Sequence, residues 1–243
     1  MIVQPGLNSL TNALKQAQKQ GITEIFLKNG EHDEKGEQVV IDFPVSIDGE
    51  SREHCRVMGG LRIYGNQKDN VNVCNLTLHE SRGSGVFGGY KGASFHLDNV
   101  SVENSGSYGV LVIGTRRSTM KNCNVSHSNW SGLFVQGGGL MTIDGNRTTL
   151  QHNCKDERSH HRGLDTADST SSIHLVSPLT VAMISKYNGG GGNKGGRGTI
   201  KTVIDEQIKQ ASKHFMQKVK TKRQSVHTPR QNSISPRQNS ICF

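Results

Sequence analysis

A repeat of about two dozen residues constrains the fold of this chain more than any other feature of its sequence. Each copy has an asparagine-led apolar alternation, then a serine, then a second alternation that opens with glycine. The asparagines are Asn75, Asn99 and Asn122, and every anchor moves by 24 residues to the second copy and by 23 to the third. A degraded fourth copy places His152 25 residues after His127. A period of this length with short strands predicts a solenoid in which each coil stacks on the last.

The repeat also predicts a register. Neighbouring coils would lie about 4.8 Å apart, the spacing of hydrogen-bonded strands, so that Leu78, Val102 and Val125 share one buried column. Two further columns follow from the same alignment. Ser81, Ser105, Ser128 and Asn153 would hydrogen-bond along a turn, and Gly85, Gly109 and Gly132 mark positions where a Cβ does not fit. Leu76, Val100 and Cys123 would form an inward column, in which Cys123 is a reduced core thiol.

The flanking segments indicate caps and connections. Residues 8–20 predict a helix capped by Asn8 or Ser9 and ended by Gly21. Short strands are predicted at 25–27, 39–41, 45–47, 61–63 and 71–73, with a polar loop at 28–37. Past Cys154 the period is disturbed, although Gly163 and Leu164 are compatible with another coil and 172–176 with a strand. The glycine-rich segment 188–198 is interpreted as either a flexible linker or a glycine-rich turn, and a linker is preferred to a phosphate-binding loop because no GxxxxGK[ST] motif is present.

The coil pattern NxxφxxxxSxxxGφφφ, behind a helix and an apolar strand, resembles the right-handed parallel β-helix of the pectin-lyase-like superfamily. The resemblance covers residues 1–155 and continues more weakly to about 200. It implies an all-β solenoid domain at 1–200 and a polysaccharide groove along one sheet. A basic amphipathic helix is predicted at 201–221, and a disordered basic tail at 222–243.

Charge and apolar pattern narrow the class of partner. The net charge is +9, but the chain from Lys201 onward contributes +7 and the first 200 residues only +2. No nucleic-acid partner is therefore expected for the body of the protein. No apolar run approaches 18 residues, and the N-terminus lacks the basic-then-apolar pattern of a secretion signal, so no membrane span and an intracellular location are expected. The five cysteines form no CxxC pair.

The outward positions of the repeat do not predict catalysis. A lyase of this superfamily would place several carboxylates for calcium on adjacent coils, and a hydrolase a close set of aspartates. Here Asp98 and Asp144 are separated by Lys121. We therefore expect a non-catalytic carbohydrate-binding or protein-binding repeat protein without a cofactor. Two alternatives stay open: a polysaccharide lyase or glycoside hydrolase with a divergent active site, and a protein-interaction scaffold.

A few polar and aromatic residues are candidates for ligand binding. Aromatic faces and guanidinium groups hold sugars and acidic polymers. The candidates are Tyr108 and Trp130 on adjacent coils, Arg116 and Arg117 in the turn after a strand, and His127 and His152 on neighbouring coils. No third ligand aligns with the two histidines, so no metal site is predicted. In the tail, Ser233 and Ser240 each follow an arginine by three residues, which predicts phosphorylation sites.

Overall fold

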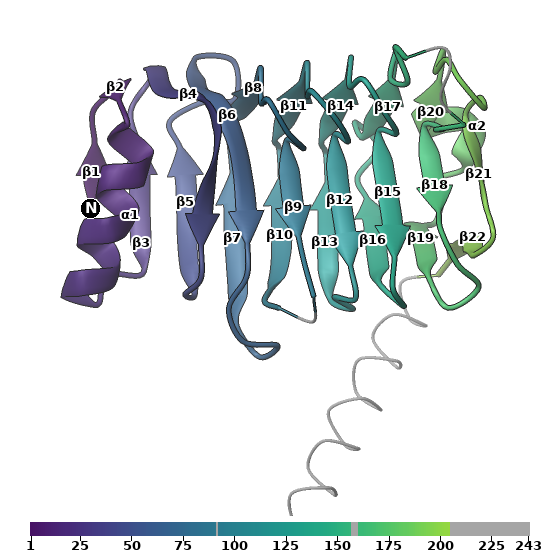
Figure 1. The fold of residues 1–243 in the computed structure, drawn as a ribbon, viewed down its shortest axis with the longest axis horizontal. Coiled ribbons are helices and arrows are strands. Elements are labelled where there is room, and N and C mark those ends of the chain that lie inside the picture. The colour runs from purple at the N-terminus through teal and green to yellow at the C-terminus, as the bar shows by residue number, and fades with distance from the viewer. Residues whose placement is uncertain (91, 157–159, 205–243) are drawn as a thin grey trace, which may run out of the picture. The chain divides into compact units, whose positions relative to one another are not determined.

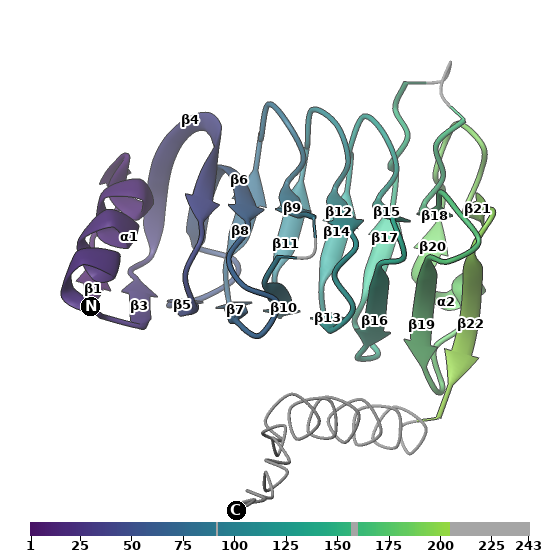
Figure 2. The ribbon, with the colours of Figure 1, turned by 60° about the horizontal axis from the view of Figure 1, so that its bottom comes forward.

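The computed structural model describes residues 1–90, 92–156 and 160–204 of the 243-residue chain. Contacts divide the chain into two units, Met1–Val203 and Ile204–Phe243. The first unit is a β-solenoid with coils stacked along one axis, shown in Figures 1 and 2. Its strands pair in parallel throughout, as the repeat predicts, because equivalent segments of successive coils run in the same direction.

One wall of the solenoid, here called face A, is a nine-stranded sheet. Each coil contributes one strand to it, so sheet order follows chain order. The strands are β1 (Ile2–Val3), β3 (Glu24–Leu27), β5 (Val45–Gly49), β7 (Asn70–Cys74), β10 (Ser94–Asp98), β13 (Ser118–Lys121), β16 (Leu140–Asp144), β19 (Ser172–Val176) and β22 (Thr199–Val203).

The second sheet bends into two further walls, here called face B and face C. Two long strands, β4 (Gly30–Ile41) and β6 (Cys55–Ile63), run through the corner, and β6 pairs with β8 in its first half and with β9 in its second. Face B continues with β2 (Gly6–Leu7), β8 (Thr77–His79), β11 (Ser101–Glu103), β14 (Asn124–Ser126), β17 (Thr149–Gln151) and β20 (Ser185–Lys186). Face C continues with β9 (Val86–Gly88), β12 (Val110–Ile113), β15 (Leu133–Gln136), β18 (Leu164–Thr166) and β21 (Lys194–Gly196).

The core is the dry column that the repeat predicts. Leu78 pairs with Val102 and Val102 with Val125, and none of the three exceeds 1% exposure. The inward column of Leu76, Val100 and Cys123 is confirmed in the same way. Apolar burial along these columns stabilises the stack, since removing a side chain from water contributes about 1.5–3 kcal/mol for a residue of this size.

Asparagine recurs at one corner of three successive coils for a conformational reason. Asn75, Asn99 and Asn122 occupy the corner between faces A and B with φ of 55°, 55° and 51°. Asparagine tolerates this left-handed region better than most residues. Their amides also join coils, because Asn99 Nδ2 donates to Asn75 Oδ1 at 2.9 Å and Asn75 Nδ2 donates to Asp48 Oδ1 at 2.8 Å.

The predicted serine column is buried, but its hydrogen bonding is only partly as predicted. Asn153 joins two coils, accepting from the Ser128 backbone N–H at 3.1 Å and donating to the Val125 carbonyl at 3.0 Å. The hydroxyls of Ser105 and Ser128, however, make no hydrogen bond within the described part of the chain. These small side chains therefore fill a tight corner and do not form a continuous ladder.

Three segments differ from the sequence-based prediction. Residues 30–41 form β4 where a loop was predicted at 28–37, because polar residues alternate in and out of that strand and His32 and Glu34 are buried. The predicted linker contains β21, which pairs with β18. Residues 199–203 form β22, so the predicted helix at 201–221 cannot begin at 201. The rest of that helix and the tail at 222–243 lie outside the described residues.

Helix α1 (Ser9–Gln20) covers the N-terminal end of the core with Leu10, Ala13, Leu14 and Ala17. Gly21 ends it at φ 68°, as predicted. The predicted N-cap is wrong, because no side chain at that position caps the helix. Glu34 of β4 replaces it, accepting from the backbone N–H groups of Leu10 at 2.8 Å and Thr11 at 3.4 Å. A second helix, α2 (Val181–Ile184), is one turn long, and neither described helix is long and apolar enough to span a membrane.

Candidate functional site

Face C carries a continuous row of outward side chains, here called the face C column. Successive strands place its members in register, and most of the residues on either side of them belong to the hydrophobic core. The column consists of Arg62, Phe87, Leu111, Phe134 and Asp165. Four steps of about 4.8 Å give it a length of about 19 Å. Three of its members are apolar, and of these Phe87 and Leu111 are only 9% and 8% exposed although they are not part of the hydrophobic core.

Three rings, those of Tyr108, Trp130 and His161, pack around Phe134 in the C-terminal half of this column, and the four rings together are here called the ring cluster. Tyr108 stacks on Phe134 with centroids 4.7 Å apart and planes 14° apart. Trp130 meets the edge of Tyr108 at 5.0 Å and stacks on His161 at 5.2 Å. Trp130 and His161 each stand two residues before the glycine that opens a face C strand, so the stacking of coils places one ring above the other.

A second group of rings lies at the N-terminal half of the column. The Arg62 guanidinium lies 5.1 Å from the centroid of Phe87 and 5.4 Å from that of Tyr64. Tyr90 lies 6.5 Å from Phe87 and is 75% exposed. Cation–π contacts of this kind hold a planar cation over a ring. Aromatic surface is therefore present at both halves of face C.

A cavity of about 590 Å³ opens beside the ring cluster, where the column ends at Asp165. Its titratable and cationic lining residues are His160, His161, Arg162, Asp165 and Arg197. Arg162 Nη1 lies 3.5 Å from Asp165 Oδ1, and the Ser131 hydroxyl donates to Asp165 Oδ2 at 3.3 Å. Only 5% of Asp165 is exposed.

Burial shifts the titration of the groups around this cavity. It raises the pKa of Asp165 above its ordinary value, against the opposing effects of Arg162 and the Ser131 hydrogen bond. It lowers the pKa of His161, with Asp165 and Asp156 acting in the opposite direction. It also raises the pKa of Tyr108, and Asp165 adds to that shift. Desolvation is the common cause, since it disfavours the charged form of each group.

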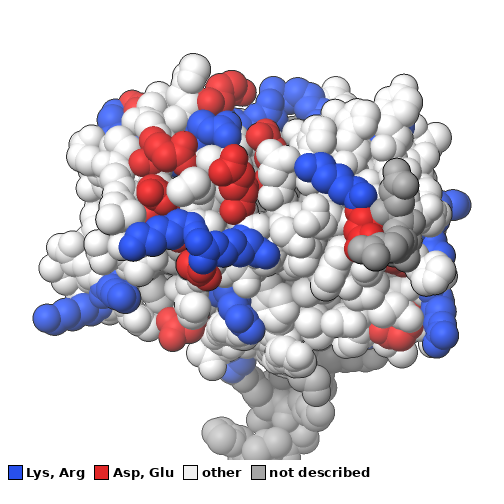
Figure 3. All heavy atoms as spheres, turned by 45° about the horizontal axis from the view of Figure 1, so that its top comes forward, with Lys and Arg blue, Asp and Glu red and all other residues white. Residues whose placement is uncertain are grey.

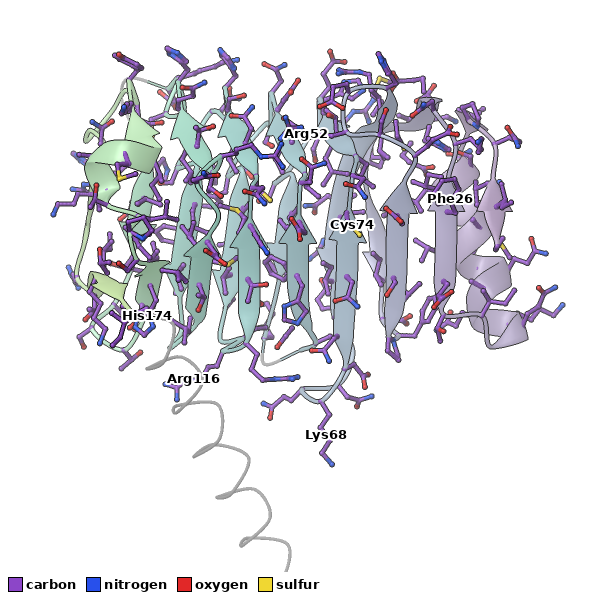
Figure 4. The ribbon with its side chains drawn as sticks, turned by 180° about the vertical axis from the view of Figure 1, so that it is seen from behind. Phe26, Arg52, Lys68, Cys74, Arg116 and His174 are labelled. Atoms are coloured by element: carbon purple, nitrogen blue, oxygen red, sulfur yellow. The ribbon has the colours of Figure 1, made fainter. Side chains whose placement is uncertain are left out.

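The structure brings together some of the predicted ligand residues and separates others. Tyr108 and Trp130 are in contact, as their positions on adjacent coils predict. Arg116 and Arg117 lie beyond the far end of β12 from Tyr108, and Figure 4 shows Arg116 among the loops at that edge. Arg116 Nε donates to the Gly138 carbonyl at 3.0 Å, and Arg117 Nη2 donates to the Gln67 carbonyl at 2.7 Å. Both arginines therefore connect loops and lie apart from the ring cluster.

His127 and His152 form a separate stack where the chain leaves face B. Their rings are 5.4 Å apart, and His152 stacks in turn on Tyr187 at 5.5 Å. All three have positive φ, which repeats at this corner of each coil. Burial, followed by Lys155 and His152, lowers the pKa of His127. No group of three or more His, Cys, Asp or Glu within the described residues could hold a metal ion. Ser233 and Ser240 lie outside those residues.

The sequence analysis missed most residues of the site, among them Phe134, His161 and Asp165. The signal for Asp165 is present in the sequence, because Gly163-Leu-Asp-Thr166 aligns with Gly132-Leu-Phe-Val135. The longer loop before Gly163 obscures that alignment. Unless the coil that begins at Gly163 is recognised, the sequence does not show that His161 lies beside Trp130 or that Asp165 points outward.

Charged side chains elsewhere on the surface compensate one another. Figure 3 shows basic and acidic groups interspersed over the N-terminal half of the face that it presents. In β4 and its neighbours, Glu37 pairs with Arg82 at 2.6 Å, and Glu31 lies 2.7 Å from His79 and 3.9 Å from Arg56. An exposed pair such as Glu37 with Arg82 contributes about 0–1 kcal/mol.

Comparison with known proteins identifies the architecture alone. The family described as the right-handed β-helix region matches residues 59–177, which span the regular coils and the whole ring cluster. No curated protein and no solved structure gives a match.

Proposed function

Because this chain is a right-handed parallel β-helix repeat protein, of a fold consistent with the pectin-lyase-like superfamily, we propose that it binds a polysaccharide along face C. One observation carries the proposal: the ring cluster stands beside an outward column that is apolar over three successive coils. Among the residues that the structure describes, ring–ring contacts are most concentrated in this cluster.

The chemistry of sugars favours such a surface. A pyranose ring has apolar C–H faces and a polar rim, so it binds where aromatic planes alternate with a few charged or hydrogen-bonding groups. Trp130 is 37% exposed at the edge of the column, and Arg62 and Asp165 stand at its two ends. The coil spacing repeats these groups at a constant interval, which suits a polymer of equal units.

Trp130 provides the test, since it is the only tryptophan in the chain. Its fluorescence is measured during titration with a panel of neutral and acidic polysaccharides, and binding is expected to shift the emission. Affinity electrophoresis then compares Trp130→Ala with Tyr187→Ala. Tyr187 is 72% exposed and stacks on His152 away from the ring cluster, so it is a matched aromatic control.

We expect Trp130→Ala to weaken binding about tenfold, because truncating an aromatic anchor typically costs more than 1 kcal/mol. Tyr187→Ala is expected to bind as the unsubstituted protein does. Equal loss in both variants would place the ligand elsewhere, and no retardation by any polysaccharide would refute the proposal.

A further inference from the structure

The outward side of face A carries a group of polar side chains on strands that are separate from those of face C. Strands β7, β10 and β13 lie side by side in this sheet (Figure 1). His96 of β10 pairs in register with Asn72 of β7 and with Thr119 of β13. Its neighbours along the strand, Phe95 and Leu97, belong to the core. His96 therefore projects outward, where it is partly exposed and within reach of a ligand.

Hydrogen bonds on both sides orient the His96 ring. Nδ1 lies 2.9 Å from the Thr119 hydroxyl, and Nε2 lies 3.2 Å from the side-chain oxygen of Asn70. Because a carbonyl oxygen only accepts hydrogen bonds, Nε2 carries the proton of the neutral ring. Nδ1 is then unprotonated, and the Thr119 hydroxyl donates to it. Thr119, His96 and Asn70 thus stand in the order of a nucleophile, a base and an orienting group.

The surroundings of His96 favour the neutral ring and supply a fixed positive charge. Burial, followed by the charge of Arg117, lowers the pKa of His96, so the ring is in its basic form at neutral pH. Arg117 Nη2 donates to the carbonyls of Gln67 at 2.7 Å and Asp69 at 3.4 Å. These bonds fix the guanidinium on the loop that leads into β7. A guanidinium held in this way can stabilise negative charge that develops on a substrate oxygen.

A cavity of about 330 Å³ opens at β7, next to these residues. Asn70 and Asn72 line it, and apart from Pro44 and Val45 its lining residues are polar. Amides, hydroxyls and charged groups favour a molecule with many hydroxyl groups over an apolar one. Thr119 lies two strands from β7, or about 10 Å. The cavity is therefore placed to hold the alcohol part of a substrate whose acyl group reaches Thr119.

We propose that face A carries a catalytic site in which Thr119, with His96 as its base, hydrolyses an acyl ester of a polyhydroxylated alcohol. Asn70 is a positioning residue in this site, because it acts through the imidazole. The inference does not depend on polysaccharide binding, since no residue of face C takes part in it.

The reaction balances with these groups and water. The Thr119 oxygen attacks the ester carbonyl carbon, and its proton passes to His96 Nδ1. The bond from that carbon to the alcohol oxygen breaks, and this oxygen takes the proton from Nδ1. Water then attacks the acyl group on Thr119 and gives a proton to Nδ1. The Thr119 oxygen leaves with that proton, so a carboxylic acid is released and the site is restored.

The experiment incubates the full-length protein with p-nitrophenyl acetate and with glucose pentaacetate. Absorbance measures the released nitrophenol, and an acetate assay measures cleavage of the sugar ester. Intact mass spectrometry of rapidly quenched samples detects an acetyl group bound to the protein, and peptide mapping locates it.

The variants are Thr119→Val, Thr119→Ser, His96→Gln and Thr142→Val, and circular dichroism checks that each is folded. Thr119→Val keeps the volume and branching of the side chain, whereas Thr119→Ser keeps the hydroxyl. Thr142 holds the same outward position one coil later and is not one of the three hydrogen-bonded residues, which makes Thr142→Val the matched control.

We expect hydrolysis of both esters and an acetyl group on Thr119. Thr119→Val is expected to lose that acetyl group, and both Thr119→Val and His96→Gln to lower the rate about 100-fold or more. Thr119→Ser and Thr142→Val should retain most of the activity. Hydrolysis no faster than in buffer, or acetylation only at another residue, overturns the inference. Undiminished activity in Thr119→Val or His96→Gln, or an equal loss in Thr119→Ser and Thr119→Val, also overturns it. Each of these outcomes leaves the proposed function standing.

Discussion

Glu34, which lies in the coil that follows helix α1, caps the N-terminus of this helix, and replacing it removes the cap. Its buried carboxylate accepts two backbone N–H groups of the first helical turn and the Thr11 hydroxyl, the latter at 2.6 Å. Glu34→Ala leaves these donors without a partner in a dry site. Loss of a helix cap costs about 0.5–2 kcal/mol, and a hydrogen bond to a charged group contributes about 1.5–3 kcal/mol. We therefore expect a loss of about 3 kcal/mol in the free energy of unfolding.

The isosteric variant separates charge from hydrogen bonding. Glu34→Gln keeps the side-chain volume and one acceptor but removes the negative charge at the positive end of the helix, which contributes about 0.3–1 kcal/mol. For a unit of this size, each kcal/mol corresponds to about 2–4 °C in Tm. The expected losses are about 6–12 °C for the alanine variant and a few degrees for the glutamine variant.

Thermal unfolding followed by circular dichroism measures both losses. Glu37→Ala is the control on the same strand, because Glu37 pairs with Arg82 at the surface and both side chains are more than half exposed. Its Tm is expected to change by no more than about 4 °C. The reasoning fails if Glu34→Ala unfolds within 2 °C of the unsubstituted protein, or if glutamine is as damaging as alanine.

Two other expectations concern packing and pH. Gly109→Ala would place its Cβ 2.3 Å from Val125 and 2.6 Å from the Gly132 carbonyl, so we expect thermal unfolding to show a loss of about 1–3 kcal/mol. Gly83→Ala, whose Cβ meets only the flexible Gln38 side chain at 3.3 Å, should change stability far less, and equal losses would contradict the column packing. Burial lowers the pKa of His96 and His174 in the folded protein, so the unfolded chain binds more protons as pH falls from about 7 to about 5. Stability should therefore decline over that window, which urea unfolding at each pH measures, and His96→Gln should make the decline smaller.

The fold follows from the sequence wherever the period is intact. Leu78, Val102 and Val125 are spaced by one coil each, and stacking then leaves them a single arrangement. The departures have local causes. The buried side chains of β4 include those of His32 and Glu34. Because these residues are polar, the sequence lacks the apolar alternation from which a strand is predicted. In β21 two of the three residues are glycines, which give no apolar alternation, and the strand is recognised by its pairing with β18.

Only part of the candidate site could be predicted from the sequence. Tyr108 and Trp130 lie in intact repeats, so their approach can be read from spacing. The pairing of Trp130 with His161 depends on a loop of irregular length, and loop length is what the repeat does not specify. The repeat also positions Arg116 and His127. Spacing alone does not show that Arg116 donates a hydrogen bond to a neighbouring loop, or that His127 stacks on His152 away from the cavity.

The way the face C column is assembled has a consequence for how such a protein can change over evolutionary time. Each coil adds one outward position, and Gly195 is the next position after Asp165. Tandem duplication of one coil, with both breakpoints at the asparagine corner, would lengthen a ligand's track by about 4.8 Å and leave every other position unaltered. The reach of this surface is thus a quantity that gene duplication can adjust in fixed increments, whereas a globular pocket would have to be rebuilt.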